Sequence, residues 1–411
     1  MERTRHAPGG CAASPDRAGA ASLPAVTPPP RTGVSGVSGV PAEGAGDAMP
    51  AFTPQGLAID LHVARGQVID LTVRSTRQAP LRSWIAGTTP GEALRRIGLA
   101  FSLCRSAQRA ACEAALETAG AVTVRTESAA ERAWHVTGEL WREHACNLFL
   151  AWPGLLGDAQ EPALVRPLLA AAGEPAVMQG KLRDLLANGA LGMDPPVWLH
   201  LDAAGLQAWC ARAATATARR FARWYGATAP APVTPRLPPV ARWGRPAANV
   251  IAATLRADPD FALHPAWAGS PAETGAIARV HAHPLLRAWI DHSGNDAGAR
   301  MLARLIELAQ AADAGPPAAE AIVRAWPVGS GSALAAVETS RGVLLHAVNV
   351  ARDRITDYRI VAPTGWNFHP HGVLRAALGS RRDAPGCGAQ AQAWSLALDP
   401  CVECTVERVH A

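Results

Sequence analysis

The feature that most constrains this chain is a pair of cysteines three residues apart, close to its C-terminus. Cys401 and Cys404 follow Asp399-Pro400 directly. Two thiolates at this spacing suit one metal ion or a bridge between two, and the proline fixes its own φ and keeps the preceding residue extended. Because a free chain end frays, we expect this one to dock in the interior of the fold.

The composition is that of a globular protein with a large core. Of 411 residues, 49% are hydrophobic and 18% charged, and the net charge of +5 comes almost wholly from scattered arginines. Nucleic-acid binding needs a basic patch or stripe, so we expect no nucleic acid as a partner. No apolar run approaches the roughly 20 residues of a membrane-spanning helix. With no signal peptide and eight dispersed cysteines, we expect a cytoplasmic protein without a membrane partner, whose thiols serve metal or redox roles rather than disulfides.

Composition also divides the chain. Residues 1–48 are rich in Ala, Gly, Pro and Ser and cannot bury enough apolar area to offset their chain entropy. We expect them to be a disordered extension, or not to be translated if Met49 is the start. Residues 49–411 are expected to form a single domain with a proline-rich connection near residues 228–248.

The hydrophobic pattern predicts a mainly α protein with small antiparallel β elements at each end of the folded part, an α+β fold. Alternation around Arg65-Gly66 predicts a hairpin over residues 57–72, and a turn at residues 352–354 predicts another over residues 335–360. The predicted helical ranges are 90–119, which carries Cys104, then 131–156, cut at Trp152-Pro153-Gly154, then further helix up to Tyr225, and finally 281–312.

Three separated segments resemble the large subunit of nickel-iron hydrogenases in order, direction and spacing. They are Asp399-Pro400-Cys401-Val402-Glu403-Cys404; the run from Glu338-Thr339-Ser340-Arg341-Gly342 through Val361-Ala362-Pro363-Thr364-Gly365-Trp366-Asn367 to Ala376-Ala377-Leu378-Gly379; and Phe101-Ser102-Leu103-Cys104-Arg105-Ser106-Ala107-Gln108. The resemblance implies the fold of that subunit.

In that family four thiolates hold the metals, two as terminal nickel ligands and two as bridges from nickel to an iron that carries cyanide and carbon monoxide. The resemblance implies that Cys104 and Cys404 are the bridging, iron-binding pair and that Cys401 matches a terminal nickel ligand. Phe101 stands at the other terminal position, so we expect the Fe(CN)2CO unit here and no nickel. The place of Cys104 at a helix start also predicts a lowered thiol pKa.

The resemblance further implies a pocket for the diatomic ligands of the iron. Arg341 matches the arginine above the metals, and Pro363 and Thr364 match the groups that receive a cyanide. Asp399 matches the carboxylate ahead of the cysteine pair, and Glu143 stands where the family has an aspartate. A planar guanidinium suits an anionic acceptor in a dry pocket.

The catalytic parts of the family pattern are replaced. Gln55 stands at the position of the proton-relaying glutamate, and an amide cannot relay a proton as a carboxylate does. Gln108 replaces a histidine and Ser340 a proline. Glu407 stands at the cleavage position with only Arg408 to Ala411 behind it, so no processing is expected. We therefore expect no catalytic residues and no enzyme activity.

This combination resembles the HupK/HoxV-type hydrogenase maturation proteins, a subgroup that Trp366-Asn367-Phe368-His369-Pro370 also fits. The resemblance implies a non-catalytic scaffold for assembly and transfer of the Fe(CN)2CO unit, which it binds transiently. It implies three partners: a HypC-type chaperone, the HypD/HypE-type complex that builds the iron unit, and the hydrogenase large subunit that receives it.

Other interpretations stay open at this point. The chain as a whole suits a divergent catalytic nickel-iron hydrogenase large subunit, or a metal-free docking module of the assembly complex. Simpler roles exist for single residues: a structural zinc half-site for the terminal cysteine pair, a buried small hydrophobe for Cys104, an ion-pair partner of Glu338 for Arg341, a solvated helix turn for Glu143-His144, and loop positions for His369 and His371.

Overall fold

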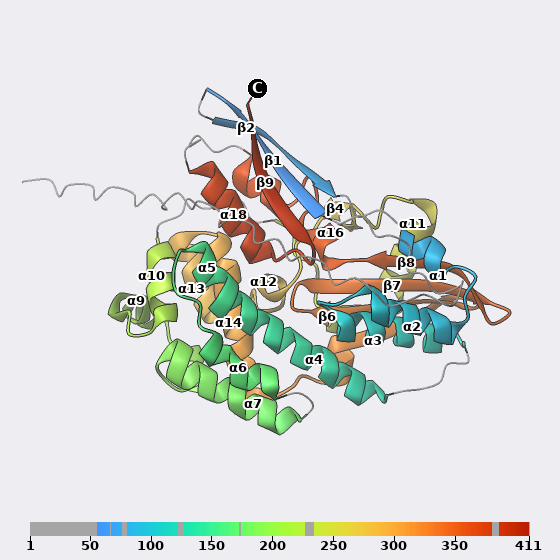
Figure 1. Ribbon diagram of the computed structural model, residues 1–411, viewed down its shortest axis with the longest axis horizontal. Helices are drawn as coiled ribbons and strands as arrows, with labels where there is room; N and C mark the ends of the chain where they lie inside the picture. Colours follow the sequence, from blue (N-terminus) through green and yellow to red (C-terminus); the bar gives the residue numbers. More distant parts are fainter. Residues whose placement is uncertain are drawn as a thin grey trace, which may run out of the picture.

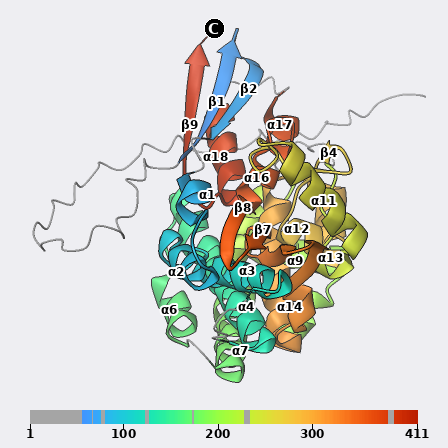
Figure 2. The same cartoon turned by 90° about the vertical axis from the view of Figure 1, so that its right-hand side faces the viewer.

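The computed structural model describes residues 56–65, 67–75, 80–121, 127–171, 174–226, 234–379 and 386–410 (Figure 1). The expected extension over residues 1–48, the alternative start Met49 and the substituted Gln55 lie outside these ranges. Helices form most of the body, one antiparallel sheet lies along one side of it, and a second, smaller sheet projects from it in both views (Figures 1 and 2).

The larger sheet has four antiparallel strands in chain order. They are β5 (Val323–Gly329), β6 (Ser332–Thr339), β7 (Gly342–Ala351) and β8 (Arg354–Val361). The predicted turn is confirmed at Arg352 and Asp353, which both have positive φ and join β7 to β8. The structure adds a second turn at Ser340 and Arg341, and the strand β5. A proline inside β5 and the alanines of β6 hide the strand signal there, because proline and alanine are depleted in strands.

Both faces of this sheet are covered, so alternate residues of β6 enter different cores. Leu334 and Ala336 pack toward α11 (Arg245–Ala257), and Ala333 and Ala335 pack toward α2 (Pro90–Ala100) and α3 (Arg105–Thr118). The short elements along its margins are α1 (Pro80–Ile85), η3 (Val240–Arg242), β3 (Ala266–Trp267), β4 (Ser270–Pro271), α15 (Ala319–Ile322) and α16 (Pro363–Asn367). The face that carries Ala333 and Ala335 is therefore the one on which α3 packs.

The helical part is built around α14 (Ala297–Ala314). The apolar side chains from Met301 to Ala309 are completely buried, as expected of a helix surrounded by other helices. Asp296 caps its start by accepting the N–H of Ala299 at 2.7 Å. It contacts α4 (Ala129–Cys146), η1 (Asn147–Ala151), α7 (Pro175–Asp184), η2 (Leu185–Leu191), α8 (Pro195–Leu199), α12 (Ala276–Arg279), α13 (Pro284–Ser293) and α18 (Cys387–Leu398). The other helices of this part are α5 (Trp152–Leu155), α6 (Pro162–Ala170), α9 (Ala203–Arg212), α10 (Ala216–Trp224) and α17 (Val373–Leu378).

Two helix predictions need correction. No break occurs at Trp152-Pro153-Gly154, because the π-helical turn η1 leads directly into α5 and Pro153 lies in the first turn of α5, where a missing N–H is tolerated. The helix α11 was not predicted, since its prolines were attributed to the connection near residues 228–248. Pro246 again lies in the first turn, where proline starts a helix instead of ending one.

The smaller sheet joins the two ends of the folded chain. The predicted hairpin is confirmed as β1 (Gly56–Ala64) and β2 (Gln67–Ser75), and β9 (Glu403–His410) pairs with β1 in parallel, with Leu57 opposite Cys404. The prediction that the C-terminus docks in the interior is wrong. It forms an edge strand whose residues 407–410 are all exposed, so pairing with β1, not burial, holds the chain end.

Candidate metal centre

The predicted site residues other than Cys404 come from five elements that meet beside the start of α3. Cys104 precedes α3, Arg341 lies in the turn between β6 and β7, and Thr364 belongs to α16. Glu143 comes from the end of α4, and Asp399 to Cys401 follow α18. Residues as far as 198 positions apart in the chain are joined by hydrogen bonds and ion pairs in this cluster, and Cys401 is close enough to Cys104 to influence its pKa.

Cys104 takes the N-cap position of α3 without capping it. The Glu139 carboxylate does so instead, accepting the N–H groups of Ser106 at 2.8 Å and Ala107 at 3.2 Å. Burial, with smaller contributions from the nearby Cys401 and Glu139, raises the pKa of Cys104 to about 12, against opposing effects of Gln108 and Arg341. The predicted lowering of this pKa is therefore wrong, because desolvation outweighs the helix start.

Arg341 is held rigidly by its own turn. Its N–H and that of Gly342 both donate to Thr339 Oγ1 at 3.2 Å, and its carbonyl accepts from Asn367 Nδ2 at 2.9 Å. Gly342 has a φ of +125°, and a Cβ there would lie 2.2 Å from a methyl carbon of Thr274, so only glycine fits. The backbone at Arg341 therefore has little freedom to move.

The Arg341 side chain points at two carboxylates. Nη2 lies 2.7 Å from Glu143 Oε2, and Nε lies 3.5 Å from Asp399 Oδ2. Burial opposes the charge, but Asp399 and Glu143 raise the pKa of Arg341 above its ordinary value. Within the described part of the chain, the buried Nε of Arg341 and Oδ2 of Asp399 have no hydrogen-bond partner of suitable geometry. A buried donor without an acceptor is costly, so this side of Arg341 suits an additional anionic acceptor.

Cys401 is tied to α16 through Thr364. The Thr364 hydroxyl lies 3.1 Å from Cys401 Sγ and accepts the Cys401 N–H at 3.3 Å. The expectation of an extended residue before Pro400 is wrong, because Asp399 ends α18 with a left-handed φ of 54° that turns the chain there. Pro363 is buried in the first turn of α16, next to Thr364. These contacts hold the Cys401 thiol on the same side as Cys104 and Arg341, whose pKa values it influences.

Cys404 lies on the other side of the same motif. It is in β9, packs against the large helical core and interacts with Ser395 of α18; burial raises its pKa. Cys401 and Val402 form a bend ahead of β9, so the two cysteines belong to different local structures. Within the described ranges, no group of three or more Cys, His, Asp or Glu side chains is arranged to hold a metal ion.

A second buried network, which was not predicted, lies next to the cluster. Arg279 donates to Glu307 at 2.5 and 2.8 Å, to Glu338 at 2.8 Å and to the Thr339 carbonyl at 3.0 Å. Glu307 also lies 2.8 Å from Nε2 of the fully buried His144. Glu338 thus pairs with Arg279 and not with Arg341, and a solvated helix turn is excluded for Glu143-His144.

The histidines near α16 are correctly assigned to a loop. His369 and His371 lie between α16 and α17, and the His371 N–H donates to His369 Nδ1 at 3.0 Å. Burial, with His264 and His371 nearby, lowers the pKa of His369 to about 4.

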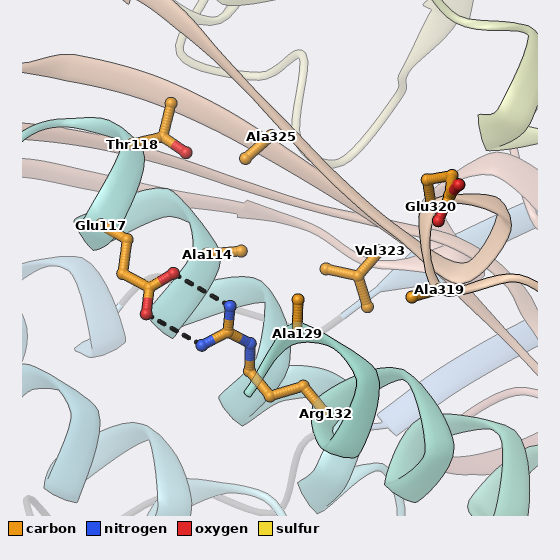
Figure 3. Close-up of a pocket in the computed structure, with 9 residues that line it drawn as sticks. All are labelled: Ala114, Glu117, Thr118, Ala129, Arg132, Ala319, Glu320, Val323 and Ala325. Carbon is orange, nitrogen blue, oxygen red and sulfur yellow. Dashed lines mark hydrogen bonds and ion pairs between the residues drawn. The ribbon is translucent and has the colours of Figure 1, made fainter. Parts of the chain in front are cut away.

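The cluster is separate from a hollow of about 240 Å³ between α3, α4 and the edge of β5 (Figure 3). Glu117 and Arg132 face each other there and form two hydrogen bonds of 2.9 Å. None of the predicted site residues lines this hollow. In the part of the chain that is described, no helix is both long and apolar enough to cross a membrane.

The sequence and the fold of this chain are similar to those of known proteins. Residues 274–377 match the family described as "Nickel-dependent hydrogenase". Among solved structures, the reduced, active form of the Ni-Fe-Se hydrogenase from Desulfomicrobium baculatum matches with a TM-score of 0.50 at 14% identity, over 83% of this chain and 95% of that chain. This likeness confirms the predicted large-subunit-like fold.

Curated relatives match over nearly their whole length. The hydrogenase expression/formation protein HupV of Azotobacter chroococcum is 30% identical over 372 residues, which are 86% of this chain and 99% of that protein. HupK of Bradyrhizobium diazoefficiens is 29% identical over 84% of this chain and 94% of its own, and HoxV of Cupriavidus necator 29% identical over 77% and 88%. The chain belongs to the family of hydrogenase expression/formation proteins that includes HupV, HupK and HoxV.

Proposed function

We propose that this chain is a non-catalytic maturation factor of a nickel-iron hydrogenase, acting in the cytoplasm as a scaffold on which the Fe(CN)2CO unit is held and from which it is transferred. The hydrogenase formation role rests on the names of relatives that match over most of the chain. The iron unit is cargo in this proposal. Cys104 and Cys404 are its ligands, Cys401 is an accessory thiolate, and Arg341, Pro363, Thr364, Asp399 and Glu143 surround its diatomic ligands.

The observation that carries the proposal is the buried Nε–H of Arg341, which forms no hydrogen bond within the described residues and has only a 3.5 Å ion pair with Asp399, next to the thiols of Cys104 and Cys401. Cyanide is an anionic acceptor, and a charge-assisted hydrogen bond to it would use this donor. Two thiols supply ligands suited to iron once they lose their protons, so binding of the unit releases protons.

Cys404 sets a condition on this binding. Its thiol faces Ser395, so ligation through Cys404 requires it to leave α18 and turn toward Cys104. The bends at Cys401 and Val402 are where the chain has room for this change, since Glu403 already pairs with Gly56. Release of the cargo is the reverse movement.

The partners of the proposal follow from the cargo. We propose that a HypC-type chaperone and the HypD/HypE-type complex deliver the iron unit and that the hydrogenase large subunit receives it.

Infrared spectra test the proposal on the full chain produced together with these partners. We expect bands of bound cyanide and carbon monoxide and one iron per chain, lost in Cys104→Ala and in Cys404→Ala and weakened in Cys401→Ala. Bands lost in Cys401→Ala but kept in Cys404→Ala would reassign the second ligand to Cys401. Absence of bands and iron from the wild-type chain, or their persistence in Cys104→Ala/Cys404→Ala, would overturn the scaffold.

One observation favours a second candidate, the metal-free docking module. Cys404 interacts with Ser395 of α18, and within the described residues no group of three or more Cys, His, Asp or Glu side chains is arranged to hold a metal ion. This function predicts that the HypC-type chaperone binds equally well to the wild-type chain and to a variant with all three cysteines changed to Ala. The scaffold predicts weaker binding to that variant.

A further inference from the structure

A chain of buried polar groups leads from Cys104 into the interface between α3 and the sheet. Gln108 Nε2 lies 3.6 Å from Cys104 Sγ, and Gln108 Oε1 lies 2.8 Å from His346 Nε2. His346 Nδ1 lies 2.6 Å from the Tyr358 hydroxyl, which also hydrogen-bonds the Cys112 thiol. Gln108, Tyr358, His346 and Cys112 are each at most 1% exposed. Water is therefore excluded, and these groups must satisfy one another.

The fold explains why these five groups line up. Cys104, Gln108 and Cys112 are spaced four residues apart and share one face of the start of α3. His346 is on β7 and Tyr358 on β8, where Val348 is the residue opposite Tyr358, so the two side chains are diagonal neighbours on one face. That face packs against α3. The row of buried polar groups is thus positioned by regular helix and strand geometry.

The position of each proton in this row of polar groups follows from the position of the Gln108 carbonyl oxygen. That oxygen can only accept, so His346 must carry its proton on Nε2. Burial lowers the pKa of His346 to about 3, so the ring is neutral and its Nδ1 is an acceptor. The single hydroxyl proton of Tyr358 goes to Nδ1, and the Cys112 thiol donates to the Tyr358 oxygen. The Gln108 amide N–H is then left facing Cys104 Sγ.

We propose that His346 and Tyr358 are positioning residues that hold the Gln108 amide with its N–H toward Cys104, so that this sulfur is presented as a hydrogen-bond acceptor. A ligating thiolate needs a donor, and the sulfur of a neutral thiol is also a weak acceptor, so this amide orientation suits Cys104 with or without its proton. Only the ligating role of Cys104 rests on the proposed function. The orientation of the amide does not require iron.

The opposite arrangement gives a distinct proton pattern. With the amide rotated, its N–H would donate to His346 Nε2, the ring proton would move to Nδ1, and the Tyr358 hydroxyl would donate to Cys112. Amide orientation and ring tautomer are therefore linked, and either one reports the other. The tautomer of His346 is measurable in the full chain without any metal.

The test is nitrogen-15 NMR of the full, metal-free chain with labelled histidine rings. The His346 signals are assigned by their loss in His346→Gln. We expect a neutral ring protonated on Nε2 at pH 7. A proton on Nδ1, or on both nitrogens, would overturn the proposal.

A matched pair of tyrosine variants tests the role of Tyr358. Removing one hydroxyl in Tyr358→Phe takes away the donor to Nδ1, and we expect the His346 ring to change to a mixture of both tautomers. The other tyrosine of the chain, Tyr225, stacks on His292 at 4.2 Å, and Tyr225→Phe should leave His346 unchanged. An unchanged tautomer in Tyr358→Phe would overturn the positioning role of Tyr358.

The iron-loaded chain adds a readout at Cys104 itself. The Gln108 N–H donor withdraws electron density from a ligating Cys104 sulfur. In Tyr358→Phe this N–H no longer points steadily at the sulfur, so the carbon monoxide and cyanide bands should move to lower wavenumber. Tyr225→Phe should leave the bands in place. Unmoved bands together with a changed tautomer would overturn the link to Cys104. If the wild-type chain carries no bands, the proposed function fails, and the tautomer decides the positioning proposal on its own.

Discussion

Two buried arginines near each other in the fold differ in how completely they are paired. Each of the three guanidinium nitrogens of Arg279 donates a hydrogen bond to a carboxylate of Glu307 or Glu338. Arg341 has one such bond, to Glu143, and its buried Nε has none within the described residues. A network in which every donor has an acceptor, which we call closed, stabilises one folded structure. In a network that is partly open, a donor remains available to bind a ligand. The difference separates a structural site from a candidate binding site.

The largest effect on stability is expected from breaking the closed network. In Arg279→Met, the buried carboxylates of Glu307 and Glu338 lose their partner, which should lower the free energy of unfolding by about 3–5 kcal/mol. Urea denaturation measures this loss. As a control, Arg183→Met removes an exposed pair with Asp194 and should cost less than about 1 kcal/mol. Equal losses in the two variants would contradict the structural role of Arg279.

Acid should weaken the closed network through His144. Burial lowers the pKa of His144 to about 4, below the unfolded value of about 6.5, so between these values the unfolded chain binds the extra proton. Stability from this ring is present above pH 6.5 and lost as the pH falls toward 4, at about 1.4 kcal/mol per pH unit. Urea midpoints between pH 7 and pH 5 should show a slope that is smaller in His144→Gln. An unchanged slope would mean that His144 is not buried as a neutral ring.

Arg341→Met should cost less stability than Arg279→Met, because the side chain of Glu143 is 23% exposed and can be hydrated, and Asp399 keeps its ion pair with Arg304. We expect a loss of about 1–2 kcal/mol, with the infrared bands of the iron unit abolished. Arg341→Lys keeps the charge without the planar donor set, so it should restore stability but not the bands. A variant that binds the iron unit normally without this guanidinium would remove Arg341 from the site.

The smallest expected effect is at Thr364. Thr364→Val keeps the shape of the side chain but removes the hydroxyl that contacts the sulfur and the N–H of Cys401. We expect a loss of about 1 kcal/mol in unfolding free energy and a shift of the infrared bands without their disappearance. Unshifted bands would show that this hydroxyl acts only on the backbone of Cys401.

The sequence predicts the regular parts of this fold and misses the parts set by tertiary contacts. The first hairpin and the helical character of residues 90–119 follow from local patterns. Strand β9 does not, although Val402, Cys404 and Val406 alternate as strand residues do. Its pairing with β1 joins segments from the two ends of the chain, which no local pattern encodes.

The candidate site follows the same division. Motif positions predicted Cys104, Cys401, Arg341, Thr364 and Asp399, and the fold brings these together. The neighbours that define their chemistry were not predicted: Glu139 caps α3 and is close enough to influence the pKa of Cys104, and Arg279 takes Glu338 away from Arg341. The high pKa of Cys104 also depends on burial, which a helix-start rule leaves out.

The central claim is that the cluster around Arg341 holds an iron unit with cyanide and carbon monoxide ligands. The most direct measurement is the infrared spectrum of the full chain produced with its hydrogenase assembly partners, recorded beside that of Cys104→Ala. We predict cyanide and carbon monoxide bands in the wild-type chain and none in the variant. Identical spectra of the two, with or without bands, would contradict the claim.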